Sequence, residues 1–251
     1  MPLTHSATLA GTTEPTEVEH ALRVALLAVA TLSEMRESDT ESHILRVSAY
    51  VRILALQLQG QPNFADVLTP QAIDQMCSSV PLYDMGSVGI PDRILLKPGR
   101  LNAEEIAILR THPTIGHEAL VRAEKTWGRP AALLTVAKEL VYCHQEKWDG
   151  SGYPRGLSGT EIPVSARIMA IADVYDALIS NKVYKDGVPH DKAVQVIFGE
   201  RGSHFDPDMV DAFIEIQDQF ADIAQRFADT DADMQNKIEY MANAIAEQAS
   251  I

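Results

Sequence analysis

The chain has 251 residues, of which 46% are apolar and 22% charged, a composition that excludes a disordered or collagen-like protein. With 21 basic and 35 acidic residues, its formal net charge of −14 makes it a poor electrostatic match for a phosphate backbone, so nucleic acid is not expected as the main partner. The two cysteines, Cys77 and Cys143, lie in no paired motif, which excludes a disulfide scaffold and predicts reduced thiols.

The N-terminal region shows neither a signal peptide nor a membrane span. It lacks a basic segment followed by an apolar core and a cleavage site. The longest apolar stretch, from Val24 to Leu32, is too short to span a bilayer. We therefore expect a cytoplasmic protein without a membrane partner, with a Thr-rich disordered leader over residues 1–16.

Helical spacing of apolar residues dominates from Val18 onward. Apolar side chains recur at steps of three and four, which is the spacing of one helix face. Thr69 before Pro70 and Asn102 before a pair of glutamates are typical of helix starts. No run alternates between apolar and polar residues over the length of a strand, so we predict an all-α fold. Helices are expected over residues 17–36, 39–59, 69–83, from 102 to a break at 113, from there to about 125, and over 131–144, 164–179, 190–200 and 207–220.

Residues 228–251 form an acidic segment that we predict to be a C-terminal helix. Apolar residues leading into it and along it recur at steps of three, four and seven, which suits a heptad-like face. Two alternatives remain open: the helix folds back on the body, or it joins two copies into a homodimer. The apolar positions are Phe213, Ile216, Phe220, Ile223, Phe227, Met234, Ile238, Met241 and Ile245.

Histidine and aspartate residues are scattered along the chain in a way that indicates a composite site. A lone histidine on a helix is more often a surface or hydrogen-bonded core residue than a ligand, and none of these lies at zinc-finger spacing. Asp173 is the sharpest case, because it lies within the most apolar predicted helix and a buried carboxylate needs a cation, a metal or hydrogen-bond donors. A metal ligand and a capping or salt-bridge role are equally consistent with it. The other candidates are Asp39 four residues before His43, Asp84 before a glycine loop, His112 before a proline, and His144 at a predicted helix end.

Residues 149–156, with the sequence Asp-Gly-Ser-Gly-Tyr-Pro-Arg-Gly, form a second unusual feature. The three glycines allow close approach of the backbone and unusual dihedral angles, while Pro154 restricts the chain after Tyr153. Tyr153 can stack on a nucleobase while backbone amides and Arg155 contact phosphate. An ordinary rigid surface turn is the alternative interpretation of this loop.

Several segments of the chain carry motifs that occur together in one known family. They are Asp39–His43, Gly89–Gly99, Thr111–Gly116, the signature Glu146–Pro154, the Ala-Asp-Val segment at Asp173, and the turn Gly202–Pro207. Through these segments the chain closely resembles the HD-GYP domain family, a bacterial branch of the HD metal-dependent phosphohydrolases. The resemblance extends from about Leu32 to Phe227, and it indicates one HD-GYP-like helical domain over residues 17–227.

The resemblance implies an all-α HD-superfamily helical bundle with a buried cluster of two or three metals, often iron or manganese. Active members of the family hydrolyse cyclic di-GMP by metal-assisted chemistry, in which Asp84 would be the catalytic residue of this chain. The metal-ligand positions carried over by the resemblance are Asp39, His43, Asp84, His112, His144 and Asp173. The nucleotide-binding positions carried over are Tyr153, Pro154, Arg155, Asp176, Lys182 and Lys185.

Three positions depart from the family pattern. Tyr83 precedes Asp84 where the family has the histidine of its His-Asp pair, and a phenol is a poor metal ligand unless it is deprotonated. Ser87 replaces a lysine able to stabilise phosphoryl charge, and Gln145 replaces a second histidine after His144. We therefore expect one or at most two divalent ions at this centre, or none.

These departures separate three hypotheses about function. The first, which we favour, is a cyclic di-GMP-binding signalling module with weak or no phosphodiesterase activity, because the signature loop is intact while the metal centre has lost ligands. The second is an active cyclic di-GMP phosphodiesterase that produces the linear dinucleotide or GMP. The third is a protein-interaction scaffold, for example for a diguanylate cyclase domain.

Overall fold

The protein is an assembly of α-helices. The computed structural model describes residues 17–34, 36, 40, 42–97, 99–128, 130–182 and 186–248, and no β-strand occurs among them, which confirms the predicted all-α class. The leader expected over residues 1–16 lies outside the described residues. The α-helices are α1 (Glu17–Glu34), α2 (Ser42–Gln59), α3 (Pro70–Ser79), α4 (Asp92–Leu95), α5 (Ala103–Leu109), α6 (His112–Trp127), α7 (Ala132–Cys143), α8 (Val164–Ile179), α9 (His190–Gly199), α10 (Pro207–Glu215), α11 (Gln217–Arg226) and α12 (Asp231–Gln248). Three short 3₁₀ helices are η1 (Val80–Leu82), η2 (Met85–Gly89) and η3 (Gly159–Glu161).

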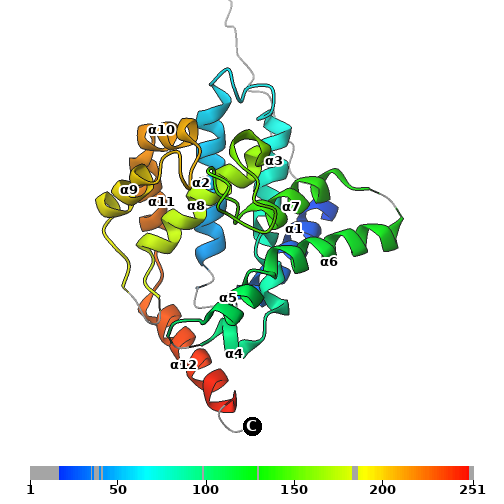
Figure 1. The fold of residues 1–251 in the computed structure, drawn as a ribbon, viewed down its shortest axis with the longest axis vertical. Helices are drawn as coiled ribbons and strands as arrows, with labels where there is room; N and C mark the ends of the chain where they lie inside the picture. The colour runs from blue at the N-terminus through cyan, green and yellow to red at the C-terminus, as the bar shows by residue number, and fades with distance from the viewer. Residues whose placement is uncertain are drawn as a thin grey trace, which may run out of the picture.

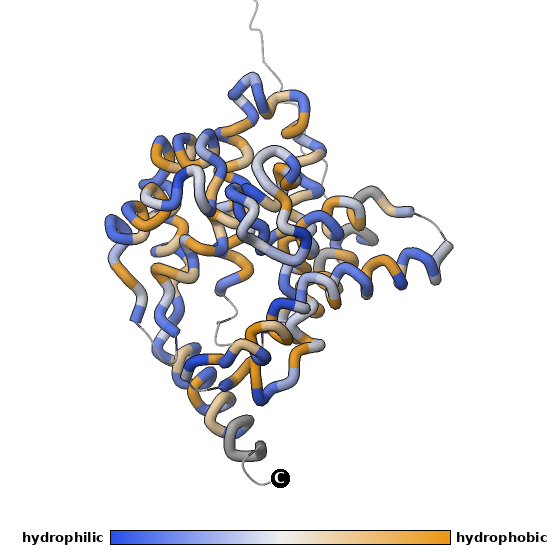
Figure 2. Tube along the Cα trace, in the orientation of Figure 1, coloured by the Kyte–Doolittle hydropathy of each residue, from blue (hydrophilic) through white to orange (hydrophobic). Residues whose placement is uncertain are grey.

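The main hydrophobic core lies around α2 and α8, with α3 and α7 on one side and α9, α10 and α11 on the other (Figure 1). Val51, Leu54 and Leu58 of α2 are fully buried at helical spacing, so the C-terminal part of this helix turns an apolar face towards the core. The rings of Tyr50 and Phe220 stack in this core with centroids 4.7 Å apart. Apolar and polar stretches alternate along the helices, as expected where each helix turns one face inward (Figure 2).

Two helix starts follow the capping chemistry predicted from the sequence. The Thr69 side chain accepts a hydrogen bond from the backbone N–H of Ala72, at 3.2 Å, in the first turn of α3. At the start of α5, Asn102 Oδ1 accepts from the N–H of Glu105 at 2.9 Å, and the Glu105 carboxylate accepts from the N–H of Asn102 at 2.8 Å. These bonds satisfy backbone donors that a helix cannot satisfy internally, which explains why the helices begin there.

The prediction of a single helix over residues 207–220 is wrong, because the structure has two helices there, α10 and α11. The chain breaks at Ile216, whose dihedral angles are φ −118° and ψ 14°. In a continuous helix, Phe213 and Phe220 would lie about 10 Å apart along the axis. The break brings their ring centroids to 4.9 Å, so both rings enter the same core. Burial of the two aromatic rings thus outweighs the lost helical hydrogen bonds.

The C-terminal helix α12 packs against the body of the same chain, as in the alternative in which it folds back. Met241 is buried, and the ammonium of Lys237 donates a hydrogen bond to the backbone oxygen of Glu34 at the end of α1, at 2.6 Å. Ile238 and Tyr240, on another side of α12, are exposed. The contacts of α12 within the described residues therefore need no second copy of the chain.

Helix α1 carries the most apolar stretch of the N-terminal region, yet much of it faces solvent. Leu32 is 64% exposed and Val24 is 54% exposed, whereas Ala30 and Ser33 are buried against the body. Among the described residues, every helix is too short or too polar to cross a bilayer.

Candidate functional site

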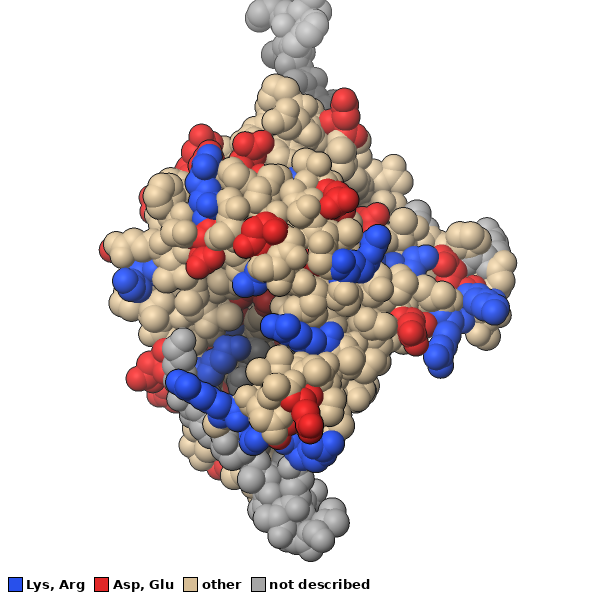
Figure 3. Space-filling model, viewed as in Figure 1, with Lys and Arg blue, Asp and Glu red and all other residues tan. Residues whose placement is uncertain are grey.

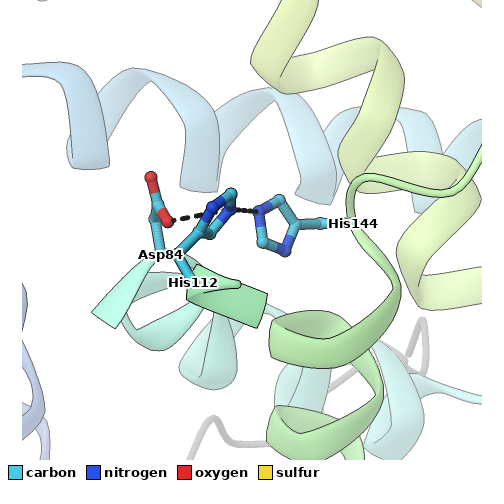
Figure 4. A group of neighbouring side chains, drawn as sticks. All are labelled: Asp84, His112 and His144. Carbon is cyan, nitrogen blue, oxygen red and sulfur yellow. Dashed lines mark hydrogen bonds and ion pairs between the residues drawn. The ribbon is translucent and has the colours of Figure 1, made fainter. Parts of the chain in front are cut away.

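Three predicted metal ligands converge on one point in the structure. Asp84, which follows η1, His112 at the start of α6 and His144 at the end of α7 each offer a ligand atom, and these atoms all lie within 4.8 Å of one another (Figure 4). The Nε2 atoms of the two histidines are 3.2 Å apart, and Asp84 Oδ1 lies 3.4 Å from His112 Nε2. Both histidines are buried, and Asp84 is partly exposed. The Asp84–His112–His144 triad therefore joins residues that are distant in sequence.

Glycine at position 86 allows this convergence. A Cβ atom added at Gly86 would lie 1.9 Å from the backbone oxygen of His112 and 2.7 Å from the backbone nitrogen of Gly116. No side chain fits in that space, so only glycine lets the backbone after Asp84 touch the first turn of α6. This close contact sets the distance between Asp84 and His112.

We expect the Gly86→Ala variant to separate η2 from α6, because the added methyl group overlaps backbone atoms that cannot move independently. Overpacking of this kind costs about 1–3 kcal/mol of folding free energy, and the displaced Asp84 should also weaken metal binding. Urea denaturation and elemental analysis of the purified variant measure the two effects. Gly199→Ala is the matched control, since a Cβ there meets no atom within 4 Å. Equal behaviour of the two variants would contradict this role of Gly86.

The protonation of the two histidines shows whether this donor set fits a metal ion. His112 Nδ1–H donates to the backbone oxygen of Leu109 at 2.8 Å, and His144 Nδ1–H donates to the backbone oxygen of Val141 at 3.1 Å. A carbonyl oxygen only accepts, so Nδ1 carries the proton and Nε2 carries a lone pair in each ring. Burial lowers the pKa of His112, and burial together with the neighbouring His112 lowers the pKa of His144 to about 3.

Both rings are therefore neutral at pH 7, and their lone pairs face each other beside a carboxylate oxygen. This arrangement is repulsive by itself and becomes favourable around a cation. Histidine metal ligands usually donate their second ring N–H to a carbonyl or carboxylate oxygen, as both rings do here. The triad thus fits a divalent metal ion.

Tyr83 separates two further predicted ligands from the triad. Its hydroxyl lies 2.8 Å from His43 Nε2 and donates to Asp173 Oδ1 at 3.0 Å. The ring of Tyr83 also meets the ring of His144 edge-on, with centroids 5.3 Å apart. The phenol therefore stands between His43 and Asp173 on one side and the triad on the other. His43 and Asp173 are therefore hydrogen-bonded to Tyr83 rather than grouped with the triad.

The buried ion pair of Arg46 and Asp176 orients His43 through the ring nitrogen that faces away from Tyr83. Arg46 Nε donates to Asp176 Oδ1 at 2.7 Å, and Arg46 Nη2 donates to Asp176 Oδ2 at 3.0 Å. His43 Nδ1–H donates to the same carboxylate at 2.8 Å, which points its Nε2 towards Tyr83. Burial alone would raise the pKa of Asp176, but the hydrogen bonds from His43 and Arg46 bring it down to about 2. Asp176 is 0% exposed, and its carboxylate orients His43 in this structure. The nucleotide contact predicted for Asp176 stays a prediction.

Ser87, where the resemblance leads us to expect a lysine, makes a structural contact. Its hydroxyl shares a hydrogen bond with the hydroxyl of Ser33 in α1 at 2.8 Å. Ser33 also lies within hydrogen-bond distance of the backbone oxygen of Asp84, at 3.1 Å, and Arg36 donates to the backbone oxygen of Ile90 at 2.8 Å. The end of α1 therefore holds the loop that carries Asp84.

The glycine-rich loop folds around a buried glutamate and presents its tyrosine to the triad. The Glu146 carboxylate accepts hydrogen bonds from the backbone N–H groups of Arg155, at 2.8 Å, and Leu157, at 3.0 Å. A Cβ at Gly152 would lie 2.3 Å from the backbone nitrogen of Lys147, so the loop requires glycine there. The ring of Tyr153 meets His112 edge-on, with centroids 6.1 Å apart. The predicted nucleotide loop thus adjoins the candidate metal centre.

The remaining predicted residues are distributed as follows. Asp39 and Lys185 lie outside the described residues. Pro154 is half-buried after Tyr153, and Lys182 is half-buried beyond the end of α8. Arg155 is exposed, and its charge acts on Cys143 and His117. The backbone oxygen of Gln145 accepts a hydrogen bond from the N–H of Tyr153 at 3.1 Å.

Two cations near the site were not among the sequence predictions. Arg46 lies three residues after His43, so both side chains share one face of α2, and this spacing was the available signal. Arg110 lies two residues before His112, and its guanidinium carbon is 5.1 Å from the centroid of the Tyr153 ring. No sequence periodicity connects Arg110 with Tyr153, because the two come from separate loops.

The family model for the HD domain matches residues 30–209 of this chain. The chain therefore belongs to the HD-domain family.

The chain is also similar to named proteins and to solved structures. A protein of Vibrio cholerae serotype O1 named "probable cyclic di-GMP phosphodiesterase" is 49% identical over 218 residues, which cover 87% of this chain and 49% of that protein. The fold resembles a solved cyclic GMP-AMP specific phosphodiesterase of V. cholerae, with a TM-score of 0.54 and 20% identity over 90% of this chain and 60% of the other. It also resembles an HDG"Y"P protein of Bdellovibrio bacteriovorus, with a TM-score of 0.51 and 16% identity over 79% of this chain and 64% of the other.

These findings confirm the predicted HD-domain family, and the relatives named cyclic di-GMP phosphodiesterases support the HD-GYP branch within it. The chain spans about half the length of the curated relatives it matches.

Proposed function

We propose that this chain is a cyclic di-GMP-binding module with weak or no phosphodiesterase activity. The observation that carries the proposal is the position of the Tyr83 hydroxyl, 2.8 Å from His43 Nε2 and 3.0 Å from Asp173 Oδ1. Two-metal hydrolysis needs ions on both sides of the reacting phosphate. A neutral phenol between two ligands disfavours a second ion, because it adds no negative charge and must move for an ion to enter.

Asp84, His112 and His144 would hold a single divalent ion. Imidazole and carboxylate donors suit iron or manganese, which are the metals implied by the resemblance. When bound, such an ion polarises a phosphodiester oxygen. The chain's own residues orient the two imidazoles through their Nδ1–H donors and hold Asp84 in place through the contact of η2 with α6.

The nucleotide would contact the loop next to this ion. Tyr153 lies beside His112, and the buried Glu146 carboxylate holds the loop in place through two backbone N–H groups. An aromatic face beside a cation suits a ligand with a purine base and a phosphodiester. Cyclic di-GMP meets this description, and the names of the relatives favour it.

The alternative is an active cyclic di-GMP phosphodiesterase, which the names of the relatives also favour. The test combines elemental analysis of the freshly purified chain, calorimetric titration with cyclic di-GMP, and chromatography of the nucleotide after incubation. We expect about one ion per chain, measurable binding and little or no product. Two ions with rapid conversion would establish the phosphodiesterase. Absence of binding would overturn the proposal and leave the interaction-scaffold hypothesis.

Tyr153→Ala should weaken cyclic di-GMP binding about 5- to 150-fold, the loss expected when one base–aromatic stacking contact of about 1–3 kcal/mol is removed. Its metal content should stay unchanged, because Tyr153 offers no ligand atom to the triad. Tyr240→Ala is the matched control, since Tyr240 is an exposed tyrosine on α12. Unchanged affinity in the Tyr153 variant would exclude this loop as the nucleotide contact.

A further inference from the structure

Arg110 is an exposed cation at the rim of the candidate site. It follows the last turn of α5, and its guanidinium carbon lies 5.1 Å from the centroid of the Tyr153 ring. No carboxylate among the described residues forms an ion pair with it, whereas Lys97 on a neighbouring segment is paired with Glu105. The guanidinium donors of Arg110 are therefore available to a ligand.

Arg110, Tyr153 and His112 form a row that leads to the triad. The guanidinium lies over the Tyr153 ring, and the same ring meets His112 edge-on at 6.1 Å. Burial raises the pKa of Tyr153 to about 12; the charge of Asp84 adds to this shift and the charge of Arg110 opposes it. Both the Asp84 carboxylate and the Arg110 cation therefore lie close enough to Tyr153 to affect its pKa. The face in Figure 3 is hollowed near its middle, and Lys and Arg side chains gather along the lower edge of the hollow, near α5.

Other cations near the loop are placed differently. Arg155 carries its charge towards Cys143 and His117. Position 87, where the resemblance leads one to expect a lysine, holds a serine bound to Ser33. Among the arginines that the structure describes, Arg110 is therefore the one whose guanidinium lies over the ring of Tyr153, which in turn contacts the candidate ligand His112.

We propose that Arg110 is a nucleotide-binding residue whose guanidinium donates to a phosphodiester oxygen of the cyclic dinucleotide at the Asp84–His112–His144 site. The inference rests on the proposed function. A guanidinium presents a planar pair of donors that matches two phosphate oxygens, and stacking on Tyr153 holds that plane in one orientation before the ligand arrives. A phosphate contact is favoured over base recognition, because the cation lies beside the acidic triad where the phosphodiester must come closest to an ion.

The test compares affinities of the manganese-loaded chain for cyclic di-GMP and for cyclic GMP-AMP, which share the phosphodiesters and differ in one base. Arg110→Met should weaken binding of both ligands by a similar factor, about 10- to 100-fold, as expected for a lost charge-assisted hydrogen bond. Arg110→Lys should recover part of the loss, because it keeps the charge without the planar donor pair. Metal content and thermal midpoint should not change, which distinguishes a ligand contact from a structural role.

Arg122→Met is the matched control, since this arginine has an 81% exposed side chain on α6 and pairs with Glu118 within its own helix. A loss confined to cyclic di-GMP would overturn the phosphate contact in favour of guanine recognition. Unchanged affinity for both ligands in Arg110→Met would overturn the inference while leaving the proposed function standing. If the unmodified chain binds neither dinucleotide, the proposed function and the inference fall together.

Discussion

The variant Tyr83→His/Ser87→Lys/Gln145→His should hydrolyse cyclic di-GMP about 100-fold faster than the unmodified chain, or more. Replacing Tyr83 removes the phenol between His43 and Asp173 and supplies an imidazole in its place. The Gln145 change adds a second imidazole after His144, and the Ser87 change returns a cation to the metal loop. A single preorganised electrostatic contact to the transition state is worth about 10²–10³ in rate, so the combined change should reach this range.

Elemental analysis provides a readout that does not depend on turnover. We expect about two ions per chain in the triple variant and about one in the unmodified chain. Tyr83→Phe is the matched control, because it removes the hydroxyl without supplying a ligand, and we expect its metal content to stay near one. A triple variant with one ion and no gain in rate would show that other positions silence the site.

Asp176→Asn should lower the free energy of unfolding by about 3 kcal/mol, because it leaves the buried Arg46 guanidinium without its main counter-charge. The side chains of this pair are 3% and 0% exposed, so water cannot replace the lost interaction. The same change removes the charge that orients His43 through its Nδ1–H. We therefore also expect weaker restraint of His43 against Tyr83.

The exposed pair Arg52–Asp74 provides the comparison, since its side chains are 48% and 64% exposed at a similar distance of 3.1 Å. Asp74→Asn should change stability by less than about 1 kcal/mol, because solvent screens the charges. Urea denaturation of both variants, read by circular dichroism, measures the difference. Equal losses in the two variants would mean that burial does not set the strength of the Arg46–Asp176 pair.

Local features of this protein could be predicted from the sequence alone. The starts of α3 and α5 follow from Thr69 and Asn102, because a capping side chain reaches a backbone N–H only two or three residues away. The all-α class follows from apolar spacing, which is also a local property. The candidate ligands Asp84, His112 and His144 could be listed because their segments resemble a known family.

Other features depend on which helices pack together. The break at Ile216 follows from the aromatic core shared by α10 and α11, and the buried carboxylate of Asp176 follows from the approach of α8 to α2. Arg110 reaches Tyr153 only because two loops from distant parts of the chain meet at the triad.

The sequence by itself determined where helices begin, which face of each is apolar and which residue types are available for chemistry, since these depend on neighbours within about one helical turn. Only the tertiary structure decided that Tyr83 ties His43 to Asp173 and that Asp84 joins His112 and His144. The physical reason is that distances between side chains far apart in sequence are set by the packing of whole helices. A contact such as that of Gly86 with the backbone of α6 becomes visible only when both elements are in place.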